Sequence, residues 1–219
     1  MKSVVNRFIK IMIFADFLVL SAFGFIGPIM AVFITAELTD GSLKVAGIAS
    51  MIFLVTKSLL QIPIAKYIDK NRGEWDDFYT MIAGYFIITA IPFLYLFISD
   101  ARQLYLAQFI YGIGGALAYP GWVSIFARHI DKGKTGFEWS LYSTTVSIGM
   151  GLAAFAGGYL ADKFGFYVVF ILVGIFSFLG TLGLLFIRKE ILLSHHLPKV
   201  ARIEKQQIKM GKKTNRRSF

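Results

Sequence analysis

Six apolar segments, each about long enough to cross a lipid bilayer, occupy most of this chain. They are expected to form helices over residues 11–35, 45–67, 78–98, 104–127, 139–160 and 167–187. At about 1.5 Å per residue, a helix of about 20 apolar residues crosses the ~30 Å hydrocarbon layer. Hydrophobic residues make up 56% of the chain, more than a soluble domain of this length can bury. The pattern therefore predicts an all-α membrane protein with six transmembrane helices.

The chain is expected to divide into three parts: a cytoplasmic N-terminal head (1–10), a six-helix transmembrane bundle (11–187) and a basic cytoplasmic tail (188–219). The first apolar segment is longer than the core of a signal peptide and is followed by no convincing cleavage site. It is therefore expected to remain as a transmembrane helix. The chain has no cysteine, which excludes disulfides and Cys-ligated metals.

The basic residues are distributed unevenly about the predicted spans. All but four of the 23 Lys and Arg residues fall on one side. Lys44, Arg102 and Lys163 lie on the other side, and Lys57 lies within a span. Cytoplasmic loops are rich in Lys and Arg, so both termini are expected in the cytoplasm, with the protein in the plasma (inner) membrane. The net charge of +10 is thus explained by the basic residues that gather on the cytoplasmic side of the spans. The basic tail is expected to be a disordered segment that reinforces this topology, and contact with anionic lipid headgroups is the alternative. No nucleic-acid partner is expected.

Three stretches are similar to conserved motifs of one protein family, which is named at the end of this paragraph. Residues 65–73 read AKYIDKNRG, and the corresponding motif of that family is Gly-x-x-x-Asp-Arg/Lys-x-Gly. Residues 108–114 read QFIYGIG, against Arg-x-x-Gln-Gly-x-Gly, and residues 157–166 read GGYLADKFGF, a nearly complete match to the end of the fifth helix. With Gly24, Gly27 and Pro28 in the first span, the chain resembles the six-helix N-terminal half of the major facilitator superfamily.

Two departures from the family pattern bear on function. Gln108 stands where the family has a helix-4 arginine, so this position does not supply a positive charge. Residues 153–158 read AAFAGG, where drug/proton antiporters of the family carry Gly-Pro-x-x-Gly-Gly. The missing proline weakens the resemblance to those antiporters.

The resemblance implies a secondary transporter that moves a small molecule by alternating access. Its two halves are parallel repeats, so two copies of one half could form a closed homodimer. A separately encoded second half and a truncated, inactive half remain alternatives, as does a non-transporting accessory or assembly subunit. No combination of nucleophile, base and acid, metal cluster or phosphate loop is evident, so neither an enzyme nor a cofactor is expected.

The family also implies a cytoplasmic gate. Its candidate residues follow the second helix or lie between the fourth and fifth: Asp69, Lys70, Arg72, Arg128, Asp131 and Glu138. Ion pairs among these helix ends would hold one conformation closed. The alternative is a solvated loop that only sets topology.

Charges inside a membrane are costly and usually face a cavity or a partner. Asp16 and Lys57 lie within the first and second spans, and one hypothesis is that protonation of Asp16 releases Lys57. In the alternative, Asp16 points toward the near membrane surface or caps locally, and Lys57 reaches a lipid headgroup.

Other polar and aromatic positions recur three or four residues apart, on single helix faces. The candidates for a substrate or proton pathway are Asp16, Lys57, Gln61, Gln108, Tyr111, Tyr119, Trp122 and Ser143. Ordinary helix packing could explain the same pattern, and it is the preferred explanation for the small residues Gly149, Ala153 and Gly157. The spans over 78–98 and 167–187 have almost no polar interior and are expected to face lipid.

Overall fold

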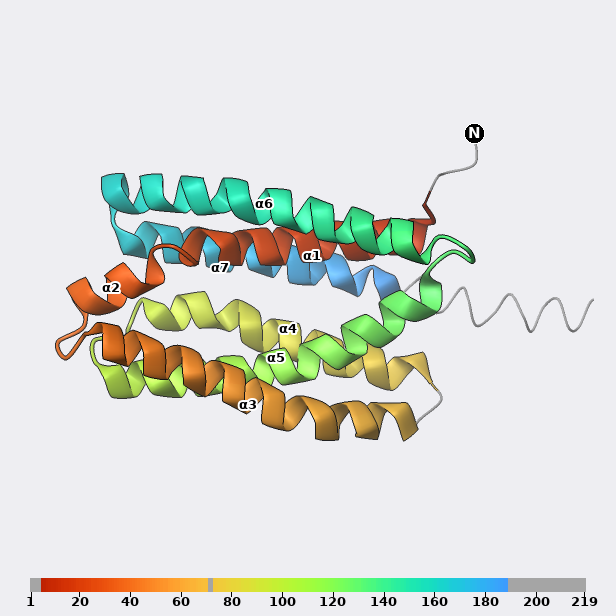
Figure 1. Cartoon of the computed structure of the whole chain (residues 1–219), viewed down its shortest axis with the longest axis horizontal. Helices are drawn as coiled ribbons and strands as arrows, with labels where there is room; N and C mark the ends of the chain where they lie inside the picture. The colour runs from red at the N-terminus through yellow and green to blue at the C-terminus, as the bar shows by residue number, and fades with distance from the viewer. Residues whose placement is uncertain (1–4, 71–72, 189–219) are drawn as a thin grey trace, which may run out of the picture.

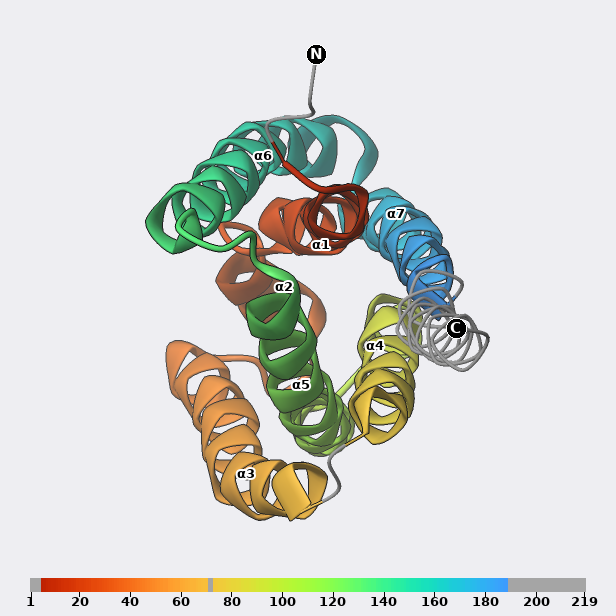
Figure 2. The same ribbon diagram turned by 90° about the vertical axis from the view of Figure 1, so that its right-hand side faces the viewer.

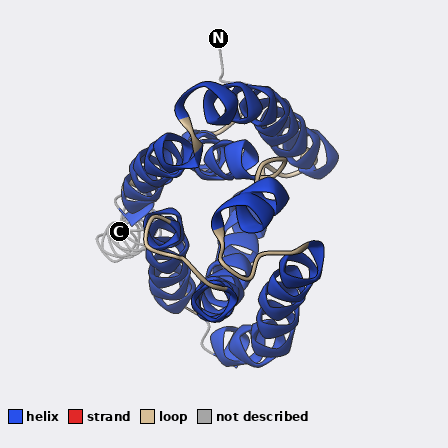
Figure 3. Ribbon diagram, turned by 90° about the vertical axis from the view of Figure 1, so that its left-hand side faces the viewer, coloured by secondary structure: helices blue, strands red, loops and turns tan. Residues whose placement is uncertain are grey.

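The computed structural model describes residues 5–70 and 73–188, which form helices joined by short connections and contain no strand (Figure 3). The helices are α1 (Arg7–Ile26), α2 (Met30–Glu37), α3 (Leu43–Lys70), α4 (Glu74–Tyr95), α5 (Ala101–His129), α6 (Thr135–Phe164) and α7 (Phe166–Leu185). All except α2 are long and apolar enough to cross a membrane. The six predicted spans are therefore present, and the last five lie within a few residues of their expected bounds.

The first predicted helix, 11–35, is wrong as a single element. It forms α1 and the short α2, with a turn at Gly27, Pro28 and Ile29 between them. Proline has no N–H to donate and its ring clashes with the preceding turn, so an α-helix tends to break there. At this turn the Ile29 amide donates a hydrogen bond to the Ile26 carbonyl at 3.1 Å, three residues back instead of the four of an α-helix.

Some predicted features lie outside the described residues. These are Arg72 and, beyond Arg188, the basic tail. At the other end of the chain α1 begins at Arg7, so residues 7–10 of the predicted N-terminal head are helical. The Asn6 side chain caps this helix, since its oxygen accepts from the Ile9 amide at 2.9 Å.

The long helices form two groups of three, α1 with α6 and α7, and α3 with α4 and α5 (Figures 1 and 2). Packing between α4 and α7 joins the groups, while α1 and α5 touch only slightly. We call the end where α3 finishes and α4 starts the basic end. It also holds the start of α1 and the connection from α5 to α6 (Figure 1).

Small residues let the helices approach closely. A Cβ on Gly84 of α4 would collide with the backbone of Ala118 on α5. A Cβ on Gly149 or Gly157 of α6 would collide with α1. The packing role predicted for the small residues of α6 is therefore confirmed at these two glycines, as is usual where membrane helices meet.

Two helices are left largely uncovered. Only 17% of the apolar stretch of α3 and 22% of that of α6 is buried, against 44–50% for the other spans. The exposed apolar side chains on these helices include Met51, Leu54, Leu59 and Ile62 of α3, and Ile148, Leu152 and Phe155 of α6. We call the side of the molecule between α3 and α6 the open face (Figure 2). The helices α4 and α7 were predicted to have almost no polar interior, and they do bury one polar pair. Thr89 and Thr181 form a hydrogen bond between these helices at 2.8 Å.

Candidate functional site

A buried carboxylate lies where α1, α4 and α6 meet. Asp16 of α1 is only 2% exposed, and both of its oxygens accept hydrogen bonds from tyrosine. Tyr85 of α4 donates to one oxygen, and Tyr142 of α6 donates to the other at 2.6 Å. Burying a carboxylate is costly unless such donors replace water. This trio of Asp16, Tyr85 and Tyr142, which we call the acid site, therefore couples three helices through one ionisable group.

An aromatic cluster flanks the acid site. The Tyr142 ring lies 4.7 Å from that of Trp122, which stacks on Phe126 at 4.8 Å. The indole N–H of Trp122 is buried and has no hydrogen-bond partner among the described residues. Tyr142 is only half-buried, whereas Asp16 and Tyr85 are buried. A carboxyl in this position can form hydrogen bonds in either protonation state. The charged form accepts hydrogen bonds through both oxygens, and the protonated form donates one and still accepts.

The structure does not pair Asp16 with Lys57. The Lys57 ammonium lies 5.0 Å from the centre of the Tyr119 ring, and its aliphatic chain packs beside Gly115. Lys57 thus meets α5, whereas Asp16 points to α4 and α6. The hypothesis that protonation of Asp16 releases Lys57 therefore has no contact to act through. The lysine is instead held by a cation–π interaction.

Two of the other predicted pathway residues lie inside the bundle. Gln108 is buried and donates to the Tyr95 hydroxyl at 3.0 Å. Tyr111 stacks between Phe23 of α1, at 5.4 Å, and Phe53 of α3, at 4.3 Å. It therefore bridges the two helix groups.

The remaining candidates lie nearer the surface. Gln61 and the exposed Tyr119 line a groove of about 410 Å³ between α3 and α5, and Ser143 is exposed on α6. Trp122 contacts the acid site through Tyr142, and Tyr119 interacts electrostatically with the same tyrosine. The eight candidates thus do not form one cluster in this bundle.

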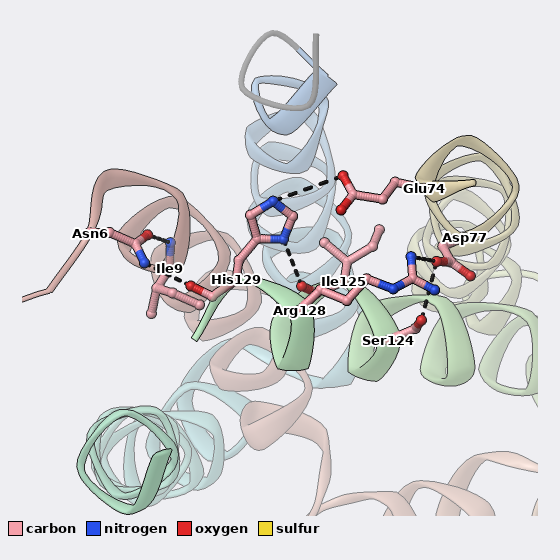
Figure 4. Close-up of polar contacts among 8 residues, drawn as sticks. All are labelled: Asn6, Ile9, Glu74, Asp77, Ser124, Ile125, Arg128 and His129. Atoms are coloured by element: carbon pink, nitrogen blue, oxygen red, sulfur yellow. Dashed lines mark hydrogen bonds and ion pairs between the residues drawn. The ribbon is translucent and has the colours of Figure 1, made fainter. Parts of the chain in front are cut away.

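An ion pair ties α4 to α5 at the basic end (Figure 4). Arg128, in the last turn of α5, binds Asp77 in the first turn of α4, and Ser124 donates to the same carboxylate oxygen at 3.2 Å. The Asp77 side chain is fully buried. Both charges suit their helix ends, because an acid is favoured at the start of a helix and a base at its end.

His129 extends this network to α1. Its ring stacks on Phe8 with 3.6 Å between centroids, and its Nδ1 donates to the Ile125 carbonyl at 2.9 Å. The Nε2 atom lies 3.9 Å from a Glu74 oxygen, close enough for an ion pair when the imidazole is protonated (Figure 4). Asn6 adds a second tie, since its amide donates to the His129 carbonyl at 2.8 Å.

The connection between α5 and α6 carries the rest of the network. Asp131 accepts from Asn6 at 3.0 Å and from Lys134 at 3.2 Å, and its own amide donates to Glu138 at 3.2 Å. The hydrogen bonds from Asn6 and Lys134 lower the pKa of the Asp131 carboxyl below its usual range.

The predicted gate is thus only partly assembled. Asp131 and Glu138 meet, but Arg128 binds Asp77, which was not predicted. Asp69 and Lys70 are exposed at the end of α3 and form no ion pair with the described residues, and Arg72 lies outside them.

Four residues of these networks were not predicted from the sequence: Tyr85, Tyr142, Asp77 and Asn6. A single tyrosine in an apolar span resembles ordinary packing, and only the fold shows that two of them converge on one acid. Asp77 did carry a signal, because it lies in a cluster of acidic residues at the predicted start of a helix.

Comparison with known proteins identifies the family. The family model of the Major Facilitator Superfamily matches residues 12–214. An uncharacterized MFS-type transporter of Methanocaldococcus jannaschii is 26% identical over 160 residues, which cover 73% of this chain and 39% of that protein. The multi-drug resistance efflux pump PmrA of Streptococcus pneumoniae is 27% identical over 186 residues, covering 83% of this chain and 45% of the pump. The chain therefore spans less than half the length of these relatives.

A solved structure shows the same fold. The POT family transporter PepTSo aligns with a TM-score of 0.72 and 18% identity, over 84% of this chain and 37% of that one. The resemblance inferred from the three motifs is thus confirmed, and so is the expectation of a transporter family in place of an enzyme. This multi-pass membrane protein belongs to the Major Facilitator Superfamily, and its six spans correspond to one half of the fold.

Proposed function

We propose that this chain supplies one six-helix bundle of a secondary transporter that moves a small molecule by alternating access. The observation that carries the proposal is the acid site. A fully enclosed carboxylate held by tyrosines from two other helices is an expensive feature in a membrane protein, and such groups commonly serve proton or substrate pathways.

In this proposal Asp16 is the proton-binding group. The charged carboxylate holds Tyr85 and Tyr142 together through two charge-assisted hydrogen bonds. Protonation removes the charge and weakens both bonds, so α4 and α6 become freer to move relative to α1. The proton therefore favours one arrangement of the bundle over another, which is the coupling that alternating access requires.

A second six-helix bundle is proposed to cover the open face. Two copies related by an axis along the membrane normal share one orientation, and α3 of one copy would meet α6 of the other. The exposed apolar side chains of both helices support this pairing. Lys57, Gln61 and Ser143 would then line a pathway between the copies.

The network at the basic end is proposed as the gate. It ties α1, α4 and α5 through Arg128, His129 and Asn6, all at the end where the sequence places most positive charge. We propose that this end is cytoplasmic and that the protein resides in the plasma membrane. Opening toward the cytoplasm would then require these ties to break.

The test is transport driven by an imposed pH gradient in vesicles that contain the purified protein. Two fluorescent probes of opposite charge are used, ethidium and carboxyfluorescein. The Lys57 ammonium would suit an anion, and one relative is named as a multi-drug efflux pump. We expect Asp16→Asn to reduce gradient-driven movement to less than a tenth of the wild-type rate. Glu37→Gln, a matched neutralisation at an exposed site on α2, should leave it unchanged.

Equal pH-driven transport by the wild type and Asp16→Asn would contradict the role of Asp16. A folded wild type that moves neither probe under the gradient would count against a self-sufficient transporter of these dyes. It would favour a half that needs a separate partner, a truncated half or a non-transporting accessory subunit. The thermal stability of each variant in detergent separates loss of coupling from loss of fold.

A further inference from the structure

A lateral groove of about 880 Å³ runs between α1 and α7, starting at the basic end. The two helices lie side by side along their length (Figure 2). The groove is lined by Arg7, Lys10, Phe14 and Leu18 of α1 and by Leu179 and Leu182 of α7. This groove is separate from the acid site and from the open face.

The α1 wall changes from charged to apolar along its length. Arg7 and Lys10 lie at the basic end and are exposed, and Phe14 and Leu18 follow on the same helix stripe. The rise from Arg7 to Leu18 is about 16 Å at 1.5 Å per residue. That depth is about half of the ~30 Å hydrocarbon layer, so the groove is one leaflet deep.

The floor of the groove is made by small residues. A Cβ on Gly183 would lie 3.3 Å from the Cβ of Ala15, so α1 and α7 come together closely behind the larger side chains. Asp16 points the other way, since it follows Ala15 on α1 and binds tyrosines of α4 and α6. The groove therefore has a cationic mouth, apolar walls, a closed floor and no contact with the acid site.

We propose that this groove binds an anionic phospholipid. The phosphate of the headgroup lies at Arg7 and Lys10, and an acyl chain follows Phe14, Leu18 and Leu179 into the membrane. Charge complementarity favours this occupant over the chain's own tail, because residues 189–219 are strongly basic and would be repelled by the same mouth.

Lipid retention measured by native mass spectrometry tests the site independently of transport. The full chain in mild detergent is titrated with phosphatidylglycerol or phosphatidylcholine. We expect phosphatidylglycerol to bind about fivefold more tightly or better, since each cation near a lipid surface contributes about a fivefold factor. Lys10→Gln should reduce this preference about fivefold, and Lys10→Arg should keep it.

Two further variants locate the lipid. Leu182→Trp fills the apolar part of the groove, so we expect it to weaken retention of phosphatidylglycerol at least fivefold. Lys66→Gln removes an exposed cation from the groove between α3 and α5 and should have no effect. Equal retention of the two lipids would overturn the proposal, as would equal losses in Lys10→Gln and Lys66→Gln. Melting of each variant in lipid-free detergent shows whether it is folded.

Discussion

The ion pair between Arg128 and Asp77 offers a quantitative test of what holds the basic end together. Replacing Arg128 with methionine keeps an unbranched, mostly apolar side chain but removes the charge. Asp77 then stays buried with the single bond from Ser124, because its other oxygen has no partner among the described residues. The variant therefore leaves a nearly unpaired charge in a closed site.

The expected cost follows from the burial of the two partners. Removing one partner of a fully buried ion pair costs about 3–5 kcal/mol. The Arg128 side chain is 36% exposed, so solvent screens the pair and we expect about 2 kcal/mol for Arg128→Met. Neutralising the acid as well, in Asp77→Asn with Arg128→Met, should recover at least ~1 kcal/mol relative to additive losses.

The assay is reversible unfolding of the purified protein in detergent micelles, followed by tryptophan fluorescence. Arg102→Met, at an exposed cation near the start of α5, is the matched control and should change stability by less than ~0.5 kcal/mol. A loss below ~0.5 kcal/mol for Arg128→Met, or strict additivity in the double variant, would refute the assigned role of the pair.

Three further outcomes are expected. Gly84→Ala should destabilise the bundle by about 1–3 kcal/mol in the same unfolding assay, because its Cβ would collide with α5, whereas Gly151→Ala, with open space around it, should not. Lys57→Met should change stability by less than ~1 kcal/mol, since it loses only a cation–π contact, yet abolish gradient-driven transport if it lines the pathway. Asp131 should stabilise the fold above about pH 4, because its pKa is lowered on folding by Asn6, and this contribution should disappear as acid titrates the carboxyl. Asp131→Asn should remove that part of the pH dependence of the melting temperature.

The sequence was sufficient to predict the six spans, because length and apolar composition determine membrane crossing almost alone. It was also sufficient for the family, through motifs at the ends of α3 and α6 and within α5. It was wrong about the single first helix, where Gly27 and Pro28 end α1. Apolar composition does not show where a helix breaks, although the proline was visible in the sequence.

The partners of charged side chains could not be predicted in the same way. Asp16 was identified because a charged side chain inside a membrane costs free energy. Its hypothesised partner Lys57 contacts Tyr119 instead, and Asp16 accepts hydrogen bonds from tyrosines. The actual donors, Tyr85 and Tyr142, lie on helices whose rotation about their axes decides what they touch. Those rotations are set by close packing at glycines, a property of the whole bundle that no single motif carries.

The central claim, a second bundle seated on the open face, is tested most directly by crosslinking in native membranes. The chain has no cysteine, so Ser58→Cys on α3 and Ser147→Cys on α6 give a clean background. Both positions are exposed and lie at the same depth from the basic end. We predict that the double variant forms a covalent dimer of the chain, whereas each single variant does not. Failure of the double variant to crosslink, alongside efficient crosslinking through Ile175→Cys on the exposed side of α7, would contradict it.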